Sequence, residues 1–164
     1  MLGVRTGLTE RPVNLYAANP ELAESFMKKD VWHLTPQERE FAAQNLDVTL
    51  NAVFSKEQMD AVKEKGMDIY DCIYIDGVSA AGRIGNKYDS LGSDADEAKK
   101  AEIMKCVLDG CQVDIARPDG KGSVEIIPLK ASSDIPVLEA ALSRQRRRFW
   151  RIPNTIWGWR SSNR

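Results

Sequence analysis

Residues 68–88 read DIYDCIYIDGVSAAGRIGNKY, and this stretch decides the predicted fold. Its first half, residues 69–75, is the densest run of apolar and β-prone side chains in the chain and predicts a buried central strand. Asp76-Gly77 follows as a sharp turn signal, and further glycines stand at positions 82 and 85. Proteins with α/β architecture often bind ligands where a buried strand ends in a carboxylate and a glycine-rich turn. The pattern therefore indicates where a site would lie, but it specifies no activity.

The chain before this stretch carries strong helix-start signals. Residues 1–11 show no periodicity and predict an irregular lead-in, and residues 13–17 predict a short strand. Asn19-Pro20, Thr35-Pro36-Gln37-Glu38 and Ser55-Lys56-Glu57-Gln58 are capping patterns that predict three successive helices, the third ending at Gly66. Residues 46–53 fit a strand as well as a helical stripe, and we favour continuing the second helix through them.

The chain after it predicts one more clear helix, a hairpin and a last helix. Ser93 is the predicted cap of a helix that ends at Gly110. Residues 112–116 and 123–129 predict the two arms of a hairpin around a Pro118-Asp119-Gly120 turn. A last helix is expected over residues 134–148. This order predicts an α+β fold, with a roughly four-stranded mixed or antiparallel sheet packed against about five helices.

Charge divides the chain into two parts. With 43% hydrophobic residues, the 164-residue chain can bury a substantial core. Residues 140–164 contain seven arginines and no carboxylate, so they carry +7; the formal net charge is −1, which leaves −8 on residues 1–139. We therefore expect a compact acidic domain over residues 1–139. Residues 140–164 would then hold the end of the last helix and a basic tail rich in arginine and tryptophan.

The glycine turn supplies the candidate catalytic residues Asp76, Ser79 and Arg83. Gly77-Val78-Ser79-Ala80-Ala81-Gly82 resembles a phosphate-binding loop, but Arg83-Ile84 stands where that loop needs lysine and a hydroxyl residue. It is also one residue too long for the Gly-x-Ser-x-Gly turn of hydrolases. The simpler interpretation is a tight turn between a strand and a helix. The functional one is an anion site made by main-chain N–H groups with Ser79 and Arg83.

Metal and thiol chemistry have weak support in the sequence. Asp76, Asp114 and Glu125 could meet around a divalent cation if their strands were neighbours, but solvated strand faces explain them more simply. Cys72, Cys106 and Cys111 are odd in number and irregularly spaced, which argues against a disulfide framework. His33 is the sole histidine, so zinc would require all four of these side chains. We predict no metal site and no cofactor.

The basic tail is the strongest functional signal. It interleaves arginines with aromatic side chains, and three of the four tryptophans fall within ten residues. Arginine makes bidentate contacts with phosphate, while tryptophan stacks on bases or settles at a lipid interface. The structural alternative is that the tail folds back onto the acidic body. The predicted contacts to an anionic partner are Arg144, Arg146, Arg147, Arg148, Trp150, Arg151, Trp157, Trp159 and Arg160.

These patterns favour a non-enzymatic interaction module of bacterial or mobile-element type. Its partner is expected to be a protein or a nucleic acid, with an anionic membrane surface as a third option. The alternative is a small effector-like enzyme, a hydrolase or a transferase, with its site at the Asp76-Gly77-Val78-Ser79 turn. No run approaches the roughly 18 apolar residues that span a bilayer, and the N-terminus lacks the apolar core of a cleaved signal. We expect a soluble, cytoplasmic protein in the cell that makes it; export without a cleaved signal stays open.

Overall fold

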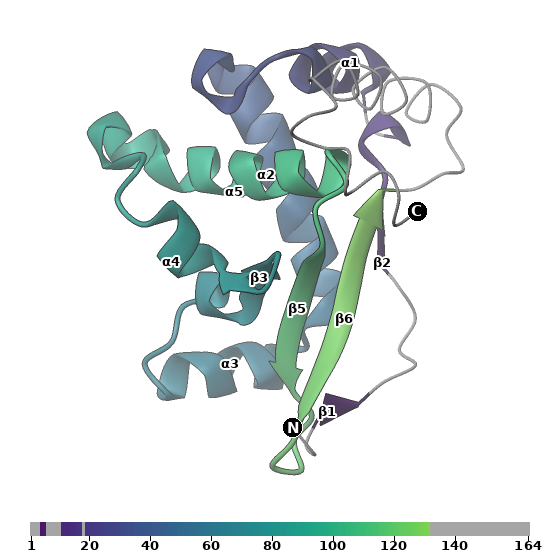
Figure 1. Ribbon diagram of the computed structural model, residues 1–164, viewed down its shortest axis with the longest axis vertical. Coiled ribbons are helices and arrows are strands. Elements are labelled where there is room, and N and C mark those ends of the chain that lie inside the picture. The colour runs from purple at the N-terminus through teal and green to yellow at the C-terminus, as the bar shows by residue number, and fades with distance from the viewer. Residues whose placement is uncertain (1–3, 6–10, 18, 132–164) are drawn as a thin grey trace, which may run out of the picture.

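The protein has an α+β fold in which helices pack against a mixed sheet (Figure 1). The computed structural model describes residues 4–5, 11–17 and 19–131. The helices are α1 (Pro20–Lys28), α2 (Pro36–Val53), α3 (Lys56–Glu64), α4 (Ala80–Ile84) and α5 (Ala95–Leu108), joined by the 3-10 turns η1 (Leu15–Ala17), η2 (Val31–His33), η3 (Ile69–Cys72) and η4 (Asp89–Asp94). The strands are β1 (Val4–Arg5), β2 (Arg11–Val13), β3 (Ile73–Ile75), β4 (Val78–Ser79), β5 (Val113–Pro118) and β6 (Val124–Ala131).

The sheet is built around the β5–β6 hairpin. Its strand order is β1-β6-β5-β3-β4, and β2 also pairs with β6. β5 lies antiparallel to both β6 and β3, with Ile115 opposite Ile127 on one side and Ile73 on the other. β1 and β2 both run parallel to β6, β1 at its start and β2 at its end. The sheet is therefore mixed, which is one of the two alternatives predicted from the sequence, and among the described residues it has six strands rather than about four.

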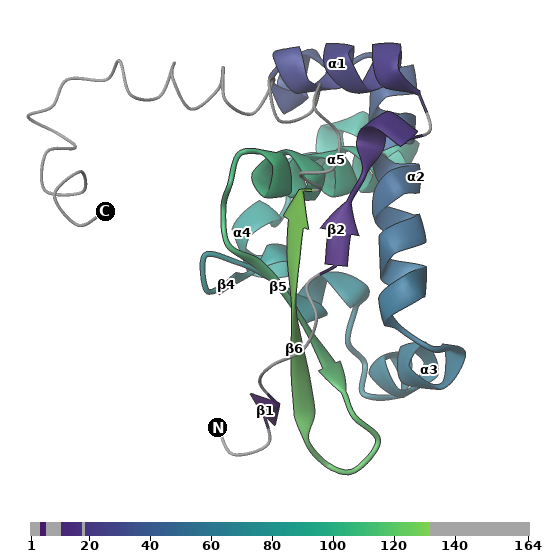
Figure 2. The ribbon, with the colours of Figure 1, turned by 90° about the vertical axis from the view of Figure 1, so that its right-hand side faces the viewer.

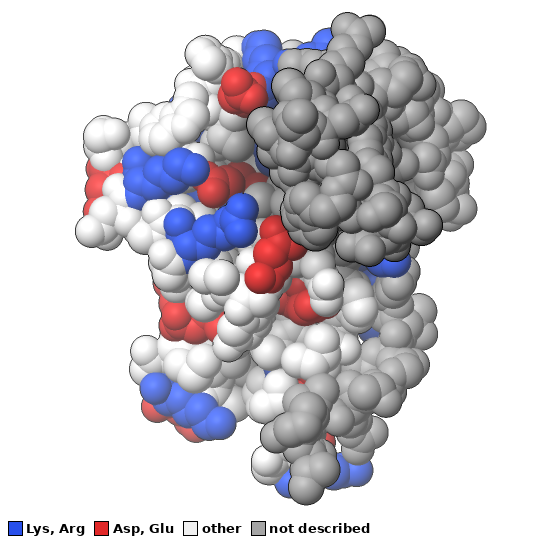
Figure 3. Space-filling model, viewed as in Figure 1, with Lys and Arg blue, Asp and Glu red and all other residues white. Residues whose placement is uncertain are grey.

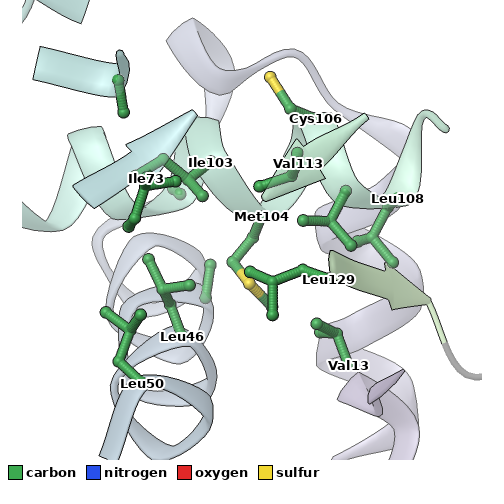
Figure 4. Packing of buried hydrophobic residues seen from close by; sticks show 14 of the residues in the cluster. Val13, Leu46, Leu50, Ile73, Ile103, Met104, Cys106, Leu108, Val113 and Leu129 are labelled. Carbon is green, nitrogen blue, oxygen red and sulfur yellow. The ribbon is translucent and has the colours of Figure 1, made fainter. Parts of the chain in front are cut away.

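The core lies between the helices and one face of this sheet. Alternate residues along the strands point to that face, and Ile73, Ile75 and Ile115 are fully buried there. Figure 2 shows α2 and α5 beside the sheet, and Figure 4 shows their side chains meeting it. The labelled side chains in Figure 4 are Val13, Leu46, Leu50, Ile73, Ile103, Met104, Cys106, Leu108, Val113 and Leu129.

The helix starts follow from their capping residues. Asn19 accepts a hydrogen bond from the main-chain N–H of Leu22 at 3.0 Å, and Pro20 begins α1. Thr35 with Glu38, and Ser55 with Gln58, form complete capping boxes at the starts of α2 and α3. Residues 46–53 belong to α2, so the helical alternative for that ambiguous segment is confirmed.

The predicted strand over residues 69–75 is too long. Residues 69–72 form η3, because Asp68 accepts from the N–H of Tyr70 while Asp71 accepts from the N–H of Asp68. β3 is therefore three residues long, and it lies between β5 and the two-residue β4 rather than at the centre of the sheet.

Three boundary predictions near the helices also need correction. Residues 4–5 and 11–13 form parallel strands where an irregular lead-in was expected, and η1 replaces most of the strand expected over 13–17. α5 is preceded by η4 and has Asp94, not Ser93, at its N-cap. The ends at Gly66 and Gly110 are confirmed, since both glycines have φ near +80°: 72° and 88°.

The hairpin of the C-terminal half is confirmed to within two residues at each end. Asp119 starts its turn, where its side chain accepts from the N–H groups of Lys121 and Ser123. The helix predicted over residues 134–148, and with it the boundary at residue 140, lies outside the described residues. Among the helices within the described ranges, none is both long and apolar enough to cross a membrane.

Candidate functional site

The Asp76-Gly77 turn joins β3 to β4 in a tight hairpin. Ile75 pairs with Val78, so Asp76 and Gly77 are the two loop residues. Both have positive φ, 50° for Asp76 and 84° for Gly77. Two successive positive values are the requirement of a type I′ turn, whose twist matches that of the flanking strands and for which Asp-Gly is a preferred sequence. The most distinctive dipeptide of the chain therefore has a complete structural explanation.

Asp76 also ties this hairpin to the start of β5. Its main-chain N–H donates to the carbonyl of Gln112 at 2.8 Å, and its Oδ1 accepts from the N–H of Gln112 at 3.1 Å. Its other carboxylate oxygen lies 3.8 Å from the guanidinium of Arg83, in α4. Both side chains are well exposed, 52% for Asp76 and 39% for Arg83, so water screens this pair strongly.

Ser79 lies where β4 becomes α4. Its hydroxyl donates to the carbonyl of Tyr70, in η3, through a long hydrogen bond of 3.5 Å. The residue is at the N-cap of α4, yet its side chain does not cap that helix. A catalytic serine needs its hydroxyl proton directed to a base, whereas here it points to a main-chain carbonyl.

The structure thus brings all three predicted catalytic candidates onto one short segment. Asp76 and Arg83 form an exposed ion pair, and Ser79 bonds away from it. Asp76 connects the β3–β4 hairpin to Gln112. The helix that follows, α4, has only five residues and is too short to offer an anion site at its N-terminus. The arrangement fits a solvent-exposed corner of the fold better than a site that activates a nucleophile.

The three carboxylates considered for a cation do not gather at one place. β5 and β6 are neighbours as required, but the register sets Asp114 opposite Pro128 and Glu125 opposite Arg117. Glu125 accepts from the Nε–H of Arg117 at 2.8 Å, so it neutralises a cation of the hairpin. Within the described part of the chain, no group of three His, Cys, Asp or Glu side chains is placed to hold a metal ion.

Sequence reasoning underestimated the pair formed by Cys106 and Cys111. Each of these two thiols affects the ionisation of the other. The interaction with Cys111, followed by burial, raises the pKa of Cys106, and the interaction with Cys106 lowers the pKa of Cys111. Burial raises the pKa of Cys72, which lies just before β3. The available signal was Gly110, because a glycine directly after a helix folds the next residue back over the last turn.

A buried carboxylate network at the start of α2 was also only partly predicted. Glu38 is 1% exposed and accepts at 2.8 Å from Lys29 Nζ, Ser25 Oγ and the N–H of Thr35. Burial alone would raise the pKa of Glu38, but these hydrogen bonds outweigh it and lower the pKa from 4.5 to about 2. The capping box predicts the Thr35 contact; the contacts to α1 depend on tertiary packing.

Two buried tyrosines anchor α5 through its carboxylates. Tyr70 donates to Asp96 at 2.5 Å, and Tyr88 donates to Glu102. Burial, followed by these carboxylate contacts, raises the pKa of both tyrosines, so both are neutral donors at ordinary pH. Tyr88 also packs against Trp32, with ring centroids 4.8 Å apart.

Basic and acidic side chains are interspersed on the visible face of the body rather than gathered by sign (Figure 3). The predicted anion-binding arginines and tryptophans all lie in residues 144–160, outside the described residues. No family model, curated protein or solved structure matches this chain.

Proposed function

We propose that this protein is a non-enzymatic macromolecular interaction module whose basic aromatic tail contacts an anionic partner. Single-stranded nucleic acid is the partner class that fits the tail composition best, because arginine neutralises phosphate and tryptophan stacks on unpaired bases. An anionic membrane surface and an acidic protein patch share part of this chemistry and are distinguished below by experiment. The bacterial or mobile-element origin stays part of this proposal.

The observation that carries the proposal is the segregation of charge along the chain. Seven arginines and no carboxylate fall in residues 140–164, while residues 1–139 carry a net −8. A solvated surface ordinarily mixes both signs, as the face of the body visible in Figure 3 does. A run of one sign is typical of a segment that meets the opposite charge on a partner.

The geometry of the body supports a non-enzymatic role. Asp76 holds the β3–β4 hairpin to Gln112, and the Ser79 hydroxyl bonds to a main-chain carbonyl. Asp96 and Glu102 are occupied by buried tyrosines, and Glu38 by three donors. These four carboxylates are therefore engaged in holding the fold.

The test is the salt dependence of binding to a fluorescent single-stranded oligonucleotide. Replacing Arg146, Arg147 and Arg148 with glutamine should weaken binding and reduce the slope of log K against log salt by about 2, since each lost phosphate contact removes about 0.7 from the slope for single strands. The matched control replaces Lys56, Lys63 and Lys65 with glutamine, which removes the same charge from the exposed residues of α3 and its C-cap.

Three outcomes separate the alternatives. If the control flattens the slope as much as the arginine variant, binding follows net charge and the tail has no special role. If vesicles with anionic lipid compete and the oligonucleotide does not bind, the partner surface is a membrane. If the intact protein binds neither the oligonucleotide nor the anionic vesicles at low salt, and deleting residues 149–164 lowers its melting temperature, the tail is bound to its own body and the proposal is wrong.

A further inference from the structure

The C-terminus of α5 places two cysteines side by side. Gly110 has φ 88°, and its N–H donates to the carbonyl of Val107 at 3.2 Å. The N–H of Cys111 donates to the carbonyl of Cys106 at 2.9 Å. This pair of hydrogen bonds is the Schellman motif, in which a residue of the last helical turn and the residue that follows the positive-φ glycine bring their side chains together. Apolar residues commonly fill these two positions, and here both are cysteines.

The two thiols differ in exposure and in electrostatic surroundings. Cys106 is 9% exposed, while Cys111 is less buried. The guanidinium of Arg83 favours the thiolate of both cysteines; Asp76 and Asp109 oppose ionisation of Cys111, and Glu102 opposes that of Cys106. The interaction between the two thiols is the largest of these effects: it raises the pKa of Cys106 and lowers the pKa of Cys111. Because Cys111 is the less buried of the two, it is the thiol that a small oxidant reaches first.

We propose that Cys106 and Cys111 form a reversible disulfide when the protein meets a peroxide. The thiolate of Cys111 attacks one peroxide oxygen, the O–O bond breaks, and the products are a sulfenic acid and, for hydrogen peroxide, water. Cys106 then attacks the sulfenic sulfur, forms the S–S bond and releases a second water. Two thiols are oxidised, one peroxide is reduced, and both thiol protons leave in the water. A low-molecular-weight thiol reverses the reaction by exchange.

The motif supplies the geometry that such a bond requires. Disulfides need their Cα atoms within about 7 Å, and residues joined by the long hydrogen bond of a Schellman motif are that close. The bond would staple the last turn of α5 to the segment that enters β5. That segment includes Gln112, whose N–H donates to Asp76, so oxidation would also affect the position of the Asp76-Gly77 turn. This inference is independent of the proposed function.

A peptide map of the full chain after hydrogen peroxide treatment tests the proposal. Trypsin releases residues 106–121 as one peptide, because Arg117 precedes a proline; this peptide holds Cys106 and Cys111, while Cys72 falls in residues 66–83. Alkylation of untreated, unfolded protein should label both cysteines of the 106–121 peptide. After peroxide treatment in the folded state, this peptide should weigh two hydrogens less and resist alkylation, and reductant should restore labelling.

Three variants make the result specific. Cys72→Ser should oxidise as the parent does, and Cys111→Ser should leave Cys106 open to alkylation after unfolding. In Cys106→Ser, which lacks the second thiol, Cys111 should be trapped as a sulfenic acid by dimedone. Retention of two alkylatable thiols in the 106–121 peptide would overturn the proposal and leave the pair as the apolar contact of the motif. A crosslink between the 106–121 and 66–83 peptides would also overturn it.

Discussion

Replacing Glu38 with glutamine tests the buried network that joins α1 to α2. Glutamine keeps the size of the side chain and can still accept from Thr35, while the adjacent Ser25 hydroxyl can turn to accept from the new amide. The charge is lost, however. A carboxyl pKa lowered from 4.5 to about 2 means that the folded chain prefers the ionised form by about 3 kcal/mol. Glu38→Gln should therefore lower the free energy of unfolding by about 3 kcal/mol at pH 7.

The pH dependence of this loss is the sharper part of the prediction. The folded-state pKa lies below the unfolded value, so the stabilisation is complete above about pH 5 and decreases as the pH falls from about 4.5 towards 2. At pH 3 the unfolded carboxyl is almost fully protonated and the folded one is mostly ionised, which leaves about 1.4 kcal/mol of the effect. The difference between parent and variant should thus shrink by about 2 kcal/mol from pH 7 to pH 3.

Urea unfolding followed by far-ultraviolet circular dichroism measures both values, because α2 is the longest helix among the described residues. Glu40→Gln is the matched control: it removes the same charge from the exposed side of α2, where the side chain accepts only an exposed hydrogen bond from Gln44. The control should change stability by less than about 0.5 kcal/mol at both pH values. If Glu38→Gln lowers the free energy of unfolding by the same amount at pH 3 as at pH 7, the electrostatic reasoning is wrong and altered packing of the side chain is the cause.

Other predictions address the core, the turn and the tail. Ile73 is fully buried and pairs with Ile115, so Ile73→Ala should cost about 2–5 kcal/mol in urea unfolding; a loss no larger than that of the partly buried Ile69→Ala would show that β3 is not part of the core. Gly77→Val should cost about 1–3 kcal/mol, because φ is 84° there, whereas Gly82→Ala in α4 should be neutral or stabilising; equal melting temperatures would contradict the type I′ turn. Trp157→Ala should weaken oligonucleotide binding about tenfold with an unchanged salt slope, and a flattened slope would assign the residue to charge rather than stacking.

What the sequence predicts well is local chemistry. A capping box needs only residues three apart, so Thr35 with Glu38 and Ser55 with Gln58 identify two helix starts without knowledge of the fold. Gly66 and Gly110 end helices because their positive φ is costly for other residues. The β5–β6 hairpin is equally local, since its strands are joined by a five-residue turn that begins at Asp119.

What the sequence does not predict depends on pairing across long distances. β1 and β2 have two and three residues, too few for a periodic pattern, and they form strands because β6 pairs with them more than a hundred residues later. The strand predicted over residues 69–72 is wrong for the opposite reason. Their apolar, β-branched composition suggested a strand, but Asp68 and Asp71 satisfy the main chain locally and favour a 3-10 turn. The contacts of Glu38 to Ser25 and Lys29 likewise arise when α1 packs on α2.

The candidate site shows how a strong sequence signal can have a structural cause. Asp76-Gly77 is conspicuous because both residues must take positive φ in a two-residue hairpin, and few other dipeptides do so easily. The same turn directs the Asp76 carboxylate back to Gln112, so its position at a strand end is explained by the register of β3 against β5. The Cys106–Cys111 pair has the opposite character. The Schellman motif explains why two side chains meet after Gly110, but any two apolar residues would satisfy it. The thiols are therefore a feature of this corner that the fold does not require, and the oxidation proposed above is a chemistry that would use them.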